Sequence, residues 1–259
     1  MDYFAVFGDP IFHSRSPKIH NFALLSFGLD GIYGRVLLKN ENELKDKFLK
    51  LNLKGANITS PHKRAAFLIS DAKDDFSMMT QSTNTLINKN GIIYGYNTDL
   101  PGFLMSIESF GKIKTALIIG AGNTASSIAI ALKSRDVEIT IVNRSDKSEN
   151  FKDFEFFTWK NYEPKNFDIV INATSASLKD FAYPMPIELL EPTLRNSKFA
   201  YDVIYNIQTP FLTLCEVFEI PYKNGKEMLI NQAAIAFNLF YDKKFDIKEI
   251  ANFMKFAIN

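Results

Sequence analysis

Cysteine and histidine are scarce in this sequence of 259 residues, which contains one cysteine and three histidines. A single cysteine excludes an internal disulfide framework and a thiolate-rich metal site. That residue, Cys215, lies in an apolar helical stretch, so we expect a packing thiol. His13, His20 and His62 are accompanied by no H-E-x-x-H pattern and no cysteine pair, so we expect no metal site.

An excess of charge and a long apolar run are also lacking. The chain has 30 Lys and Arg against 29 Asp and Glu, a formal net charge of +1, which gives no electrostatic reason to expect binding to nucleic acid or an anionic membrane. No apolar run approaches the roughly 20 residues that cross a bilayer. The first residues do not resemble a signal peptide. With 46% hydrophobic and 23% charged residues, we expect a globular, cytoplasmic protein that binds neither nucleic acid nor a membrane.

The first hundred residues alternate short apolar runs with helical patterns. Strands are predicted over 3–7, 32–37 and 55–58, and helices from Ser16-Pro17 and over 41–53. Serine is a favoured N-cap and proline suits the first helical position, so Ser16 is the predicted cap. The β-α-β-α-β order predicts a mostly parallel sheet with covering helices.

The middle of the chain contains a β-α-β unit with a clearer sequence pattern than the first hundred residues. The apolar run 115–119 predicts a strand buried on both faces, followed by a glycine loop and a helix, with further strands over 137–142, 167–171 and 199–203. From 225 to the end the pattern predicts helices and no strand. This order predicts an α/β protein with two domains.

The glycine loop reads Gly120-x-Gly122-x-x-Ala125 between the strand and the helix. The first glycine permits a tight turn, the second lets the backbone approach a pyrophosphate, and the small third residue lets helix and strand pack. The helix N-terminus supplies free N–H groups for the phosphates. We therefore predict dinucleotide binding; the alternative is a turn that needs small residues only for packing.

Cofactor choice depends on the residues after the second strand of this unit, where NAD sites usually carry an acidic residue. This chain has Asn143-Arg144-Ser145, with Lys147 nearby. An arginine there can pair with a 2′-phosphate, which favours NADP. Asp146 can serve a ribose 2′-hydroxyl, so NAD remains an alternative.

Three polar strings lie in the first hundred residues, at 8–21, 57–63 and 95–99. The first places Ser14 and Ser16 beside a helix N-terminus, a suitable site for a carboxylate. The second places Lys63 just after a strand, where ligands of α/β proteins tend to bind. The third ends in an acidic residue, Asp99.

These strings and two later ones make the chain resemble the shikimate dehydrogenase family over nearly its whole length. The matching motifs are G-x-P-I-x-H-S-x-S-P-x-I-H-N at 8–21, N-(V/I)-T-x-P-x-K at 57–63, G-x-N-T-D at 95–99, D-x-x-Y-N with T-P at 202–210, and G-x-x-M-L-x-x-Q-A at 225–233. Five motifs in the right order are far more specific than the glycine loop alone.

The resemblance implies a fold and a reaction. It implies a substrate domain over 1–100 plus 225–259, completed by the C-terminal helices, and a Rossmann-like NADP-binding domain over 101–224. The implied reaction is reversible reduction of 3-dehydroshikimate to shikimate by NADPH, a step of chorismate and aromatic amino acid biosynthesis. The partners would be small molecules, and the protein a monomer or homodimer.

The resemblance also implies the site, position by position. Lys63 and Asp99 would be the catalytic pair. The substrate would also contact Ser14, Ser16, Thr59, Asn84, Tyr205 and Gln232. The cofactor would contact Gly120, Ala121, Gly122, Asn123, Thr124, Ala125, Asn143, Arg144, Ser145, Thr174, Ile204 and Gly225.

The implied pair suits the chemistry. Negative charge builds on the substrate oxygen as hydride arrives, and a lysine can stabilise that charge and donate a proton. Asp99 would orient the ammonium group more than activate it.

Several positions depart from the family pattern. Asn123 and Thr124 change the glycine loop, 81–83 reads Gln-Ser-Thr where the family commonly has G-A-V, and Ile207 replaces a usual proline. Asp146 falls where NAD-accepting relatives can carry an Asp. Two alternatives therefore stay open: a quinate/shikimate dehydrogenase that uses NAD, and a catalytically idle nucleotide or ligand sensor on the same fold.

Overall fold

A computed structural model describes residues 1–178 and 180–258 of the protein. The chain forms two compact units, which we call unit 1 (Met1–Gly102 with Leu229–Asn259) and unit 2 (Phe103–Met228). The divisions expected from the sequence, after residues 100 and 224, fall two and four residues from these boundaries.

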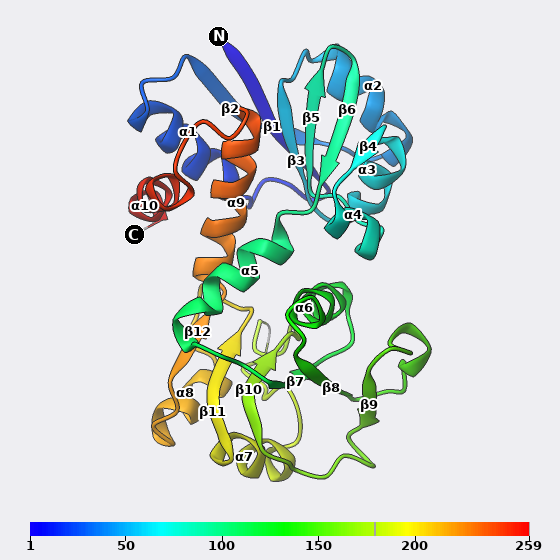
Figure 1. Cartoon of the computed structure of the whole chain (residues 1–259), viewed down its shortest axis with the longest axis vertical. Coiled ribbons are helices and arrows are strands. Elements are labelled where there is room, and N and C mark those ends of the chain that lie inside the picture. Colours follow the sequence, from blue (N-terminus) through cyan, green and yellow to red (C-terminus); the bar gives the residue numbers. More distant parts are fainter. Residues whose placement is uncertain (179, 259) are drawn as a thin grey trace. The chain divides into compact units, whose positions relative to one another are not determined.

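Unit 1 begins with the predicted β-α-β-α-β order (Figure 1). Its elements are β1 (Asp2–Gly8), α1 (Ser16–Ser26), β2 (Gly31–Leu37), α2 (Leu44–Lys50), β3 (Gly55–Ile58), α3 (Lys63–Ile69), β4 (Ala72–Lys73), α4 (Asp75–Thr80), β5 (Thr85–Lys89) and β6 (Ile92–Tyr96). The helix expected over 41–53 is a 3₁₀ turn, Glu41–Glu43, followed by the shorter α2.

The sheet of unit 1 has the strand order β2-β1-β3-β5-β6-β4. β1 pairs in parallel with β2 and β3, as predicted, but β5 runs antiparallel to both β3 and β6. Asn90 and Gly91, both with positive φ, turn the chain between β5 and β6. An Asn-Gly pair between apolar runs is a strong hairpin signal, and it could have revealed these two strands.

The reversal of β5 has a consequence for the polar residues. Because β5 is antiparallel to its neighbours, its amino end lies at the same sheet edge as the carboxyl ends of β1, β3 and β6. We call this edge the polar edge of unit 1.

The start of α1 differs from the prediction. Ser16 is the first helical residue rather than the N-cap, which is Arg15 and makes no side-chain capping bond. The Ser14 hydroxyl instead accepts a hydrogen bond from the Ser16 backbone N–H at 3.3 Å. The serine that bonds this helix terminus is therefore Ser14.

The C-terminal helices complete the core of unit 1. α9 (Lys226–Phe240) and α10 (Ile247–Ile258) pack with α1 and one face of the sheet; Figure 1 draws them in orange and red. Phe240 of α9 stacks on Phe4 of β1 with ring centroids 4.9 Å apart. Gly55 of β3 leaves room for the same ring, because an added Cβ would lie 2.3 Å from Phe240 Cδ1.

Unit 2 is a doubly wound sheet. It receives the end of α5 (Asp99–Ile107) and contains β7 (Thr115–Ile119), α6 (Asn123–Lys133), β8 (Glu138–Asn143), β9 (Glu155–Thr158), β10 (Phe167–Asn172), α7 (Ile187–Arg195), β11 (Ser197–Asp202), α8 (Pro210–Val217) and β12 (Tyr222–Asn224). The order is β12-β11-β10-β7-β8-β9, with all pairs parallel.

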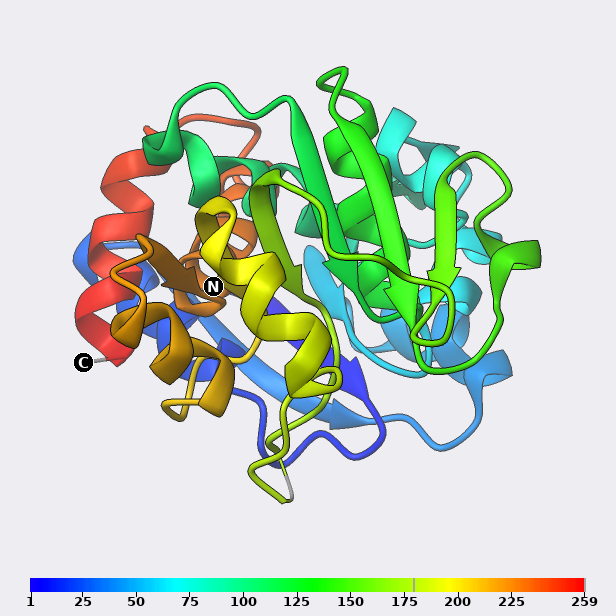
Figure 2. The same ribbon diagram turned by 90° about the horizontal axis from the view of Figure 1, so that it is seen from below.

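The two faces of this sheet have separate helical covers. Leu117 and Ile119 of β7 pack in one cluster with residues of α7 and α8, including Cys215, which is fully buried as predicted. Ile118, one position along the strand, points to the opposite face. Figure 2 shows α6 and α7 on opposite sides of the strands. Among the described residues, no helix is long and apolar enough to cross a membrane.

We predict that Gly55→Ala destabilises the protein by about 1–3 kcal/mol, because the new methyl group overpacks the core against Phe240. Gly34→Ala in β2 of the same sheet is the matched control, since a Cβ there meets nothing within 4 Å. Denaturant unfolding of both variants measures the difference; equal midpoints would contradict the packing role assigned to Gly55.

Candidate active site

The polar edge of unit 1 brings together residues from four strands. Ser14 and Ser16 follow β1, Thr59 and Lys63 follow β3, Asn84 immediately precedes β5, and Asp99 follows β6. These are six of the eight predicted substrate residues. Strand ends at one edge of a sheet bring such distant residues to one place.

Lys63 and Asp99 form an ion pair at this edge. Lys63 Nζ lies 2.5 Å from Asp99 Oδ2, and the two side chains are 33% and 19% exposed. Lys63 is the first residue of α3, and its backbone carbonyl accepts a hydrogen bond from Thr83 N at 3.0 Å. The pair is therefore partly sheltered but open enough to meet a ligand.

The segment just before Asp99 is held by partly buried polar contacts. Asn97 Oδ1 accepts from the Asp99 N–H at 3.2 Å, and the Asn97 N–H donates to Asp74 Oδ1 at 3.1 Å. Desolvation raises the pKa of Asp74, which also caps α4 through Ser77 N. Sequence reasoning missed Asp74, and its position just before a helical segment was the available signal.

The loop between β3 and Lys63 is tied to β1 and to the end of β2. His62 is buried, with Nε2 2.6 Å from the Leu38 carbonyl oxygen at the end of β2. Thr59 N donates to the carbonyl of Phe7 in β1 at 2.9 Å. Gly8 permits this approach, because a Cβ there would lie 2.5 Å from Thr59 Cγ2.

The serine loop is anchored to β2. Arg35 donates through Nη2 and Nε to the Ser14 carbonyl oxygen, at 2.6 and 3.2 Å. Both serine side chains remain partly exposed. Their hydroxyls lie at the start of α1, where an anionic group is favoured.

Gln232 lies on α9, in the C-terminal part of unit 1. A Cβ on Gly102 of α5 would lie 2.7 Å from the Gln232 backbone nitrogen, so the two helices touch at this glycine. Asp99 begins the same helix α5 one turn earlier. Tyr205, the remaining predicted substrate residue, belongs to unit 2 and follows β11.

The predicted cofactor residues all lie at the carboxyl edge of the sheet of unit 2. They follow β7 (Gly120–Ala125), β8 (Arg144 and Ser145, after Asn143 ends the strand), β10 (Thr174), β11 (Ile204) and β12 (Gly225). Strand order reverses between β7 and β10, which is where doubly wound folds bind their ligands.

The glycine loop has the geometry that a phosphate needs. Gly120 has φ +111°, and Gly122 is the N-cap of α6 with open space where a Cβ would be. No side chain caps this helix among the described residues, so its first N–H groups are free to bind an anion. Ala125 is fully buried, as helix packing requires. These features fit a dinucleotide.

Two further glycine contacts bring the predicted nicotinamide-side residues together. A Cβ on Gly120 would lie 2.9 Å from Thr174 Cγ2, and one on Gly225 would lie 2.2 Å from the Val203 carbonyl oxygen. Gly225 N also donates to the Ile204 carbonyl oxygen at 3.4 Å. Gly225 is therefore required by the close approach of the Val203 backbone, and Gly120 by its positive φ.

Buried Asp202 orders the segment that carries Ile204 and Tyr205. It accepts hydrogen bonds from Ile204 N at 3.0 Å, Thr209 Oγ1 at 2.7 Å and Asn172 Nδ2 at 3.1 Å. Desolvation raises the pKa of Asp202. Asn172 Oδ1 in turn accepts from Thr174 N and Oγ1, which links the ends of β10 and β11.

The residues after β8 bear on cofactor choice. Arg144 is exposed, and Asn143 Nδ2 donates to the Ser145 carbonyl oxygen at 2.8 Å. Asp146 turns back on its own chain, where its Oδ1 accepts from Ser148 N at 2.9 Å. This bond and the Ser148 side chain lower the pKa of Asp146.

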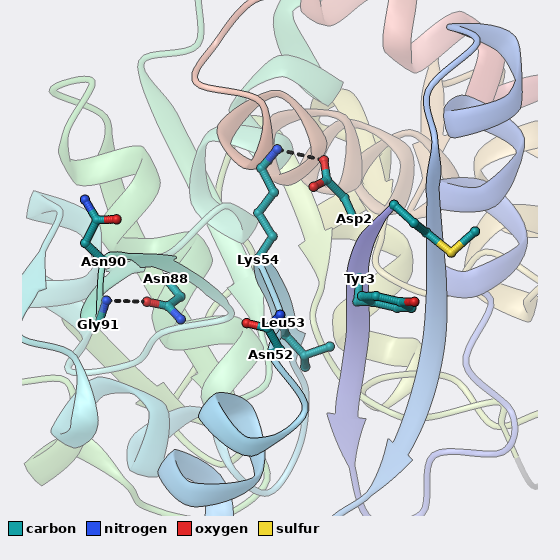
Figure 3. A pocket seen from close by; sticks show the side chains of 9 residues that line it. Asp2, Tyr3, Asn52, Leu53, Lys54, Asn88, Asn90 and Gly91 are labelled. Carbon is teal, nitrogen blue, oxygen red and sulfur yellow. Dashed lines mark hydrogen bonds and ion pairs between the residues drawn. The ribbon is translucent and has the colours of Figure 1, made fainter.

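A hollow of about 460 Å³ lies at the end of the unit 1 strands opposite the polar edge (Figure 3). Its lining includes the start of β1 and the turn between β5 and β6. Lys54 Nζ and Asp2 Oδ2 form an ion pair there at 2.8 Å. None of the predicted site residues lines this hollow.

A doubly wound parallel sheet with a phosphate-type glycine loop, joined to an α/β unit that carries a lysine–carboxylate pair, defines a dinucleotide-dependent oxidoreductase. Two family models match the chain: the shikimate dehydrogenase substrate binding domain at residues 6–86, and shikimate / quinate 5-dehydrogenase at residues 106–202. The chain belongs to the shikimate dehydrogenase family.

Similar proteins agree with this family. The shikimate dehydrogenase (NADP(+)) of Helicobacter hepaticus is 42% identical over 98% of both chains, and that of Pelagibacter ubique is 36% identical over 92% of both. The structure of shikimate 5-dehydrogenase from Thermus thermophilus in complex with NADP(H) and shikimate is 29% identical, with a TM-score of 0.84 over 99% of this chain and 100% of that one. The enzyme from Listeria monocytogenes in complex with shikimate and NAD is 27% identical, with a TM-score of 0.85 over 97% and 96%.

His20, within the string 8–21, leads to a prediction for how stability depends on pH. Its ring stacks on Tyr33 at 4.2 Å, and burial lowers the pKa of His20 from 6.5 to about 3. Between these two pKa values His20 is protonated in the unfolded chain and neutral in the folded chain. The free energy of unfolding should therefore fall as pH decreases from about 6.5 to about 3. His20→Phe keeps the stack and should flatten this fall, by up to about 1.4 kcal/mol per pH unit. Parallel stability–pH curves for the two proteins would contradict it.

Proposed function

We propose that this protein is a shikimate dehydrogenase that reversibly reduces 3-dehydroshikimate to shikimate with NADPH. The single observation that supports this most directly is the Lys63–Asp99 ion pair at the polar edge of unit 1. In this proposal unit 1 is the substrate domain and unit 2 the NADP domain. The family models, which match residues in each unit, support that division.

The substrate is an anionic ring with several hydroxyl groups, and the polar edge supplies suitable partners. The hydroxyls of Ser14 and Ser16 bind its carboxylate beside the N-terminus of α1. Thr59, Asn84 and Gln232 of the same unit bind and orient the ring. Several weak contacts that fix one orientation lower the entropic cost of reaching the transition state.

Lys63 and Asp99 manage the proton. NADPH supplies the hydride when bound. Lys63 stabilises the negative charge that develops on the C3 oxygen of the substrate and donates the proton that this oxygen requires. In the reverse direction Lys63 accepts that proton. Asp99, which holds the ammonium group at 2.5 Å, fixes its direction and accepts a hydrogen bond from a neighbouring substrate hydroxyl.

The cofactor residues have separate tasks. Gly120–Ala125 hold the pyrophosphate, because Gly122 leaves the backbone accessible at the start of α6. Thr174, Ile204 and Gly225 line the nicotinamide side. Arg144, with Asn143 and Ser145, binds the 2′-phosphate of NADP. Asp146 is engaged with Ser148, which favours NADP over NAD.

The alternatives are a quinate/shikimate dehydrogenase that uses NAD and an idle sensor on this fold. The preserved ion pair disfavours the sensor, since a protein that only binds a ligand has no need of a proton donor. We propose a cytoplasmic enzyme, active as a monomer or homodimer.

The catalytic proposal is tested by absorbance at 340 nm with 3-dehydroshikimate and NADPH. Lys63→Ala should reduce kcat by about 10²–10⁴-fold, because the developing charge loses its proton donor. Lys54→Ala, which removes a lysine paired to an aspartate in the Figure 3 hollow, is the control and should leave kcat within about twofold. No turnover by the native protein, or equal rates for native and Lys63→Ala, would refute the proposal.

The same assay separates orientation from activation by Asp99. Asp99→Asn keeps the shape but weakens the hold on the ammonium group, so we expect a lower kcat with an unchanged form of the pH–rate profile. Loss of the basic limb of that profile would show that Asp99 activates Lys63 instead.

Cofactor choice is tested by Arg144→Ala. The variant should raise the KM for NADP⁺ about tenfold or more and leave the KM for NAD⁺ nearly unchanged, because only NADP carries the 2′-phosphate. Arg135→Ala is the control. Arg135 is also exposed, but it precedes β8, whereas Arg144 follows it. If both KM values rise together, Arg144 does not read the 2′-phosphate.

A further inference from the structure

Beneath the polar edge of unit 1 lies a buried chain of hydrogen bonds that ends at Asn84. Its members are Tyr33, Asn57, Thr85, Asn84 and Thr98, each 7% exposed or less. They come from β2, β3, the start of β5 and the segment after β6. Of these residues, the proposed function uses only Asn84.

The contacts of Asn84 specify which way its amide group points. Asn84 Oδ1 accepts from Thr98 N at 2.9 Å, from Thr85 Oγ1 at 2.9 Å and from Thr98 Oγ1 at 3.2 Å. The Thr98 N–H is a backbone group that can only donate. A reversed amide would place its own NH₂ against that donor, so the carbonyl side must face inward.

The next link in the chain has an equally definite direction. Asn57 Nδ2 donates to Thr85 Oγ1 at 3.0 Å and lies 3.4 Å from the Asn84 backbone carbonyl oxygen, which can only accept. Asn57 Oδ1 accepts from the Tyr33 hydroxyl at 2.7 Å. Thr85 Oγ1 accepts this hydrogen bond, and its own hydroxyl donates to Asn84 Oδ1 at 2.9 Å, a shorter contact than the 3.4 Å to the Thr98 hydroxyl.

The backbone of Asn84 is held from both sides as well. Its N–H donates to the Tyr96 carbonyl oxygen at 3.0 Å, and its carbonyl accepts from Ile58 N at 2.7 Å. With main chain and carbonyl group both engaged inward, the amide nitrogen Nδ2 is the group left to meet a ligand. None of the hydrogen bonds found in the described part of the chain uses it as a donor.

We propose that Asn57 and Thr85 are positioning residues that hold Asn84 with its NH₂ group toward the substrate, so that this position recognises a substrate oxygen by donating to it. The inference rests on the proposed function. It assigns roles to two buried residues that would not touch the substrate. Thr98 contributes through its N–H and its hydroxyl.

The test uses Thr85→Val, which has nearly the same shape but no hydroxyl group. Asn84 then loses one of its inward bonds and its amide can rotate. We expect the KM for shikimate to rise about tenfold, with kcat and the KM for NADP⁺ changed less than about twofold. Thr85→Ser restores the hydroxyl and should restore the KM for shikimate. Thr140→Val is the control: a buried strand threonine of unit 2 whose hydroxyl bonds Glu155.

A double-mutant cycle separates positioning from general destabilisation. In an Asn84→Ala background no amide remains to be positioned, so Thr85→Val should add less than about twofold to the KM for shikimate. If it adds the same factor as in the native protein, or if Thr85→Ser fails to restore the KM, the proposal is overturned.

Should Thr85→Val fail to fold, Thr98→Val provides the second measurement. It removes the 3.2 Å hydroxyl bond to Asn84 and the 3.4 Å contact between the Thr98 and Thr85 hydroxyls, and it keeps the backbone bond to Asn84. A rise of about threefold in the KM for shikimate that disappears in the Asn84→Ala background supports positioning; a rise that persists there overturns it. Native protein that does not oxidise shikimate with NADP⁺ refutes the proposed function, whereas an active native enzyme with uncoupled Thr85 and Asn84 refutes only the positioning role.

Discussion

The ion pair between Lys63 and Asp99 depends on where the strands of unit 1 end. Along the chain, α3, β4, α4 and the β5–β6 hairpin lie between the two residues. Their charged atoms are nevertheless 2.5 Å apart. This proximity requires β3 and β6 to end at the same edge of the sheet, with β5 running antiparallel between them. Without that reversal, Asn84 would lie at the far edge of the sheet from the pair.

The site is held by polar contacts from neighbouring residues as well as by the ion pair between two of its own members. His62 binds the lysine loop to the end of β2, Asn97 holds the aspartate loop, and Arg35 holds the serine loop. These supporting groups leave the exposed ends of Lys63, Asp99 and the two serines available to a ligand. A site supported in this way is organised before the ligand arrives, which reduces the entropic cost of binding.

In unit 2 the main constraint is the space left for a ligand at the carboxyl edge of the sheet. Its parallel strands all end at one edge. The positive φ of Gly120 and the close backbone approach at Gly225 admit no larger residue there. The free N–H groups at the start of α6 then face the position where a pyrophosphate would bind. These features suit any dinucleotide. In the function we propose, the choice between NADP and NAD would depend on a few exposed side chains after β8.

The sequence by itself determined the α/β class, the glycine loop and the family, because these depend on local periodicity and on motifs whose order along the chain is visible. The family resemblance also implied Lys63, Asp99 and Asn84 as site residues. The tertiary structure alone decided that β5 is reversed, that Ser14 rather than Ser16 bonds the start of α1, and that Thr85 and Asn57 lie beneath Asn84. Such contacts join strands that are distant in sequence, and an isolated buried threonine or asparagine leaves no periodic signal. Which residues approach one another is set by strand pairing, and which atom each presents is set by the hydrogen bonds that burial obliges it to make.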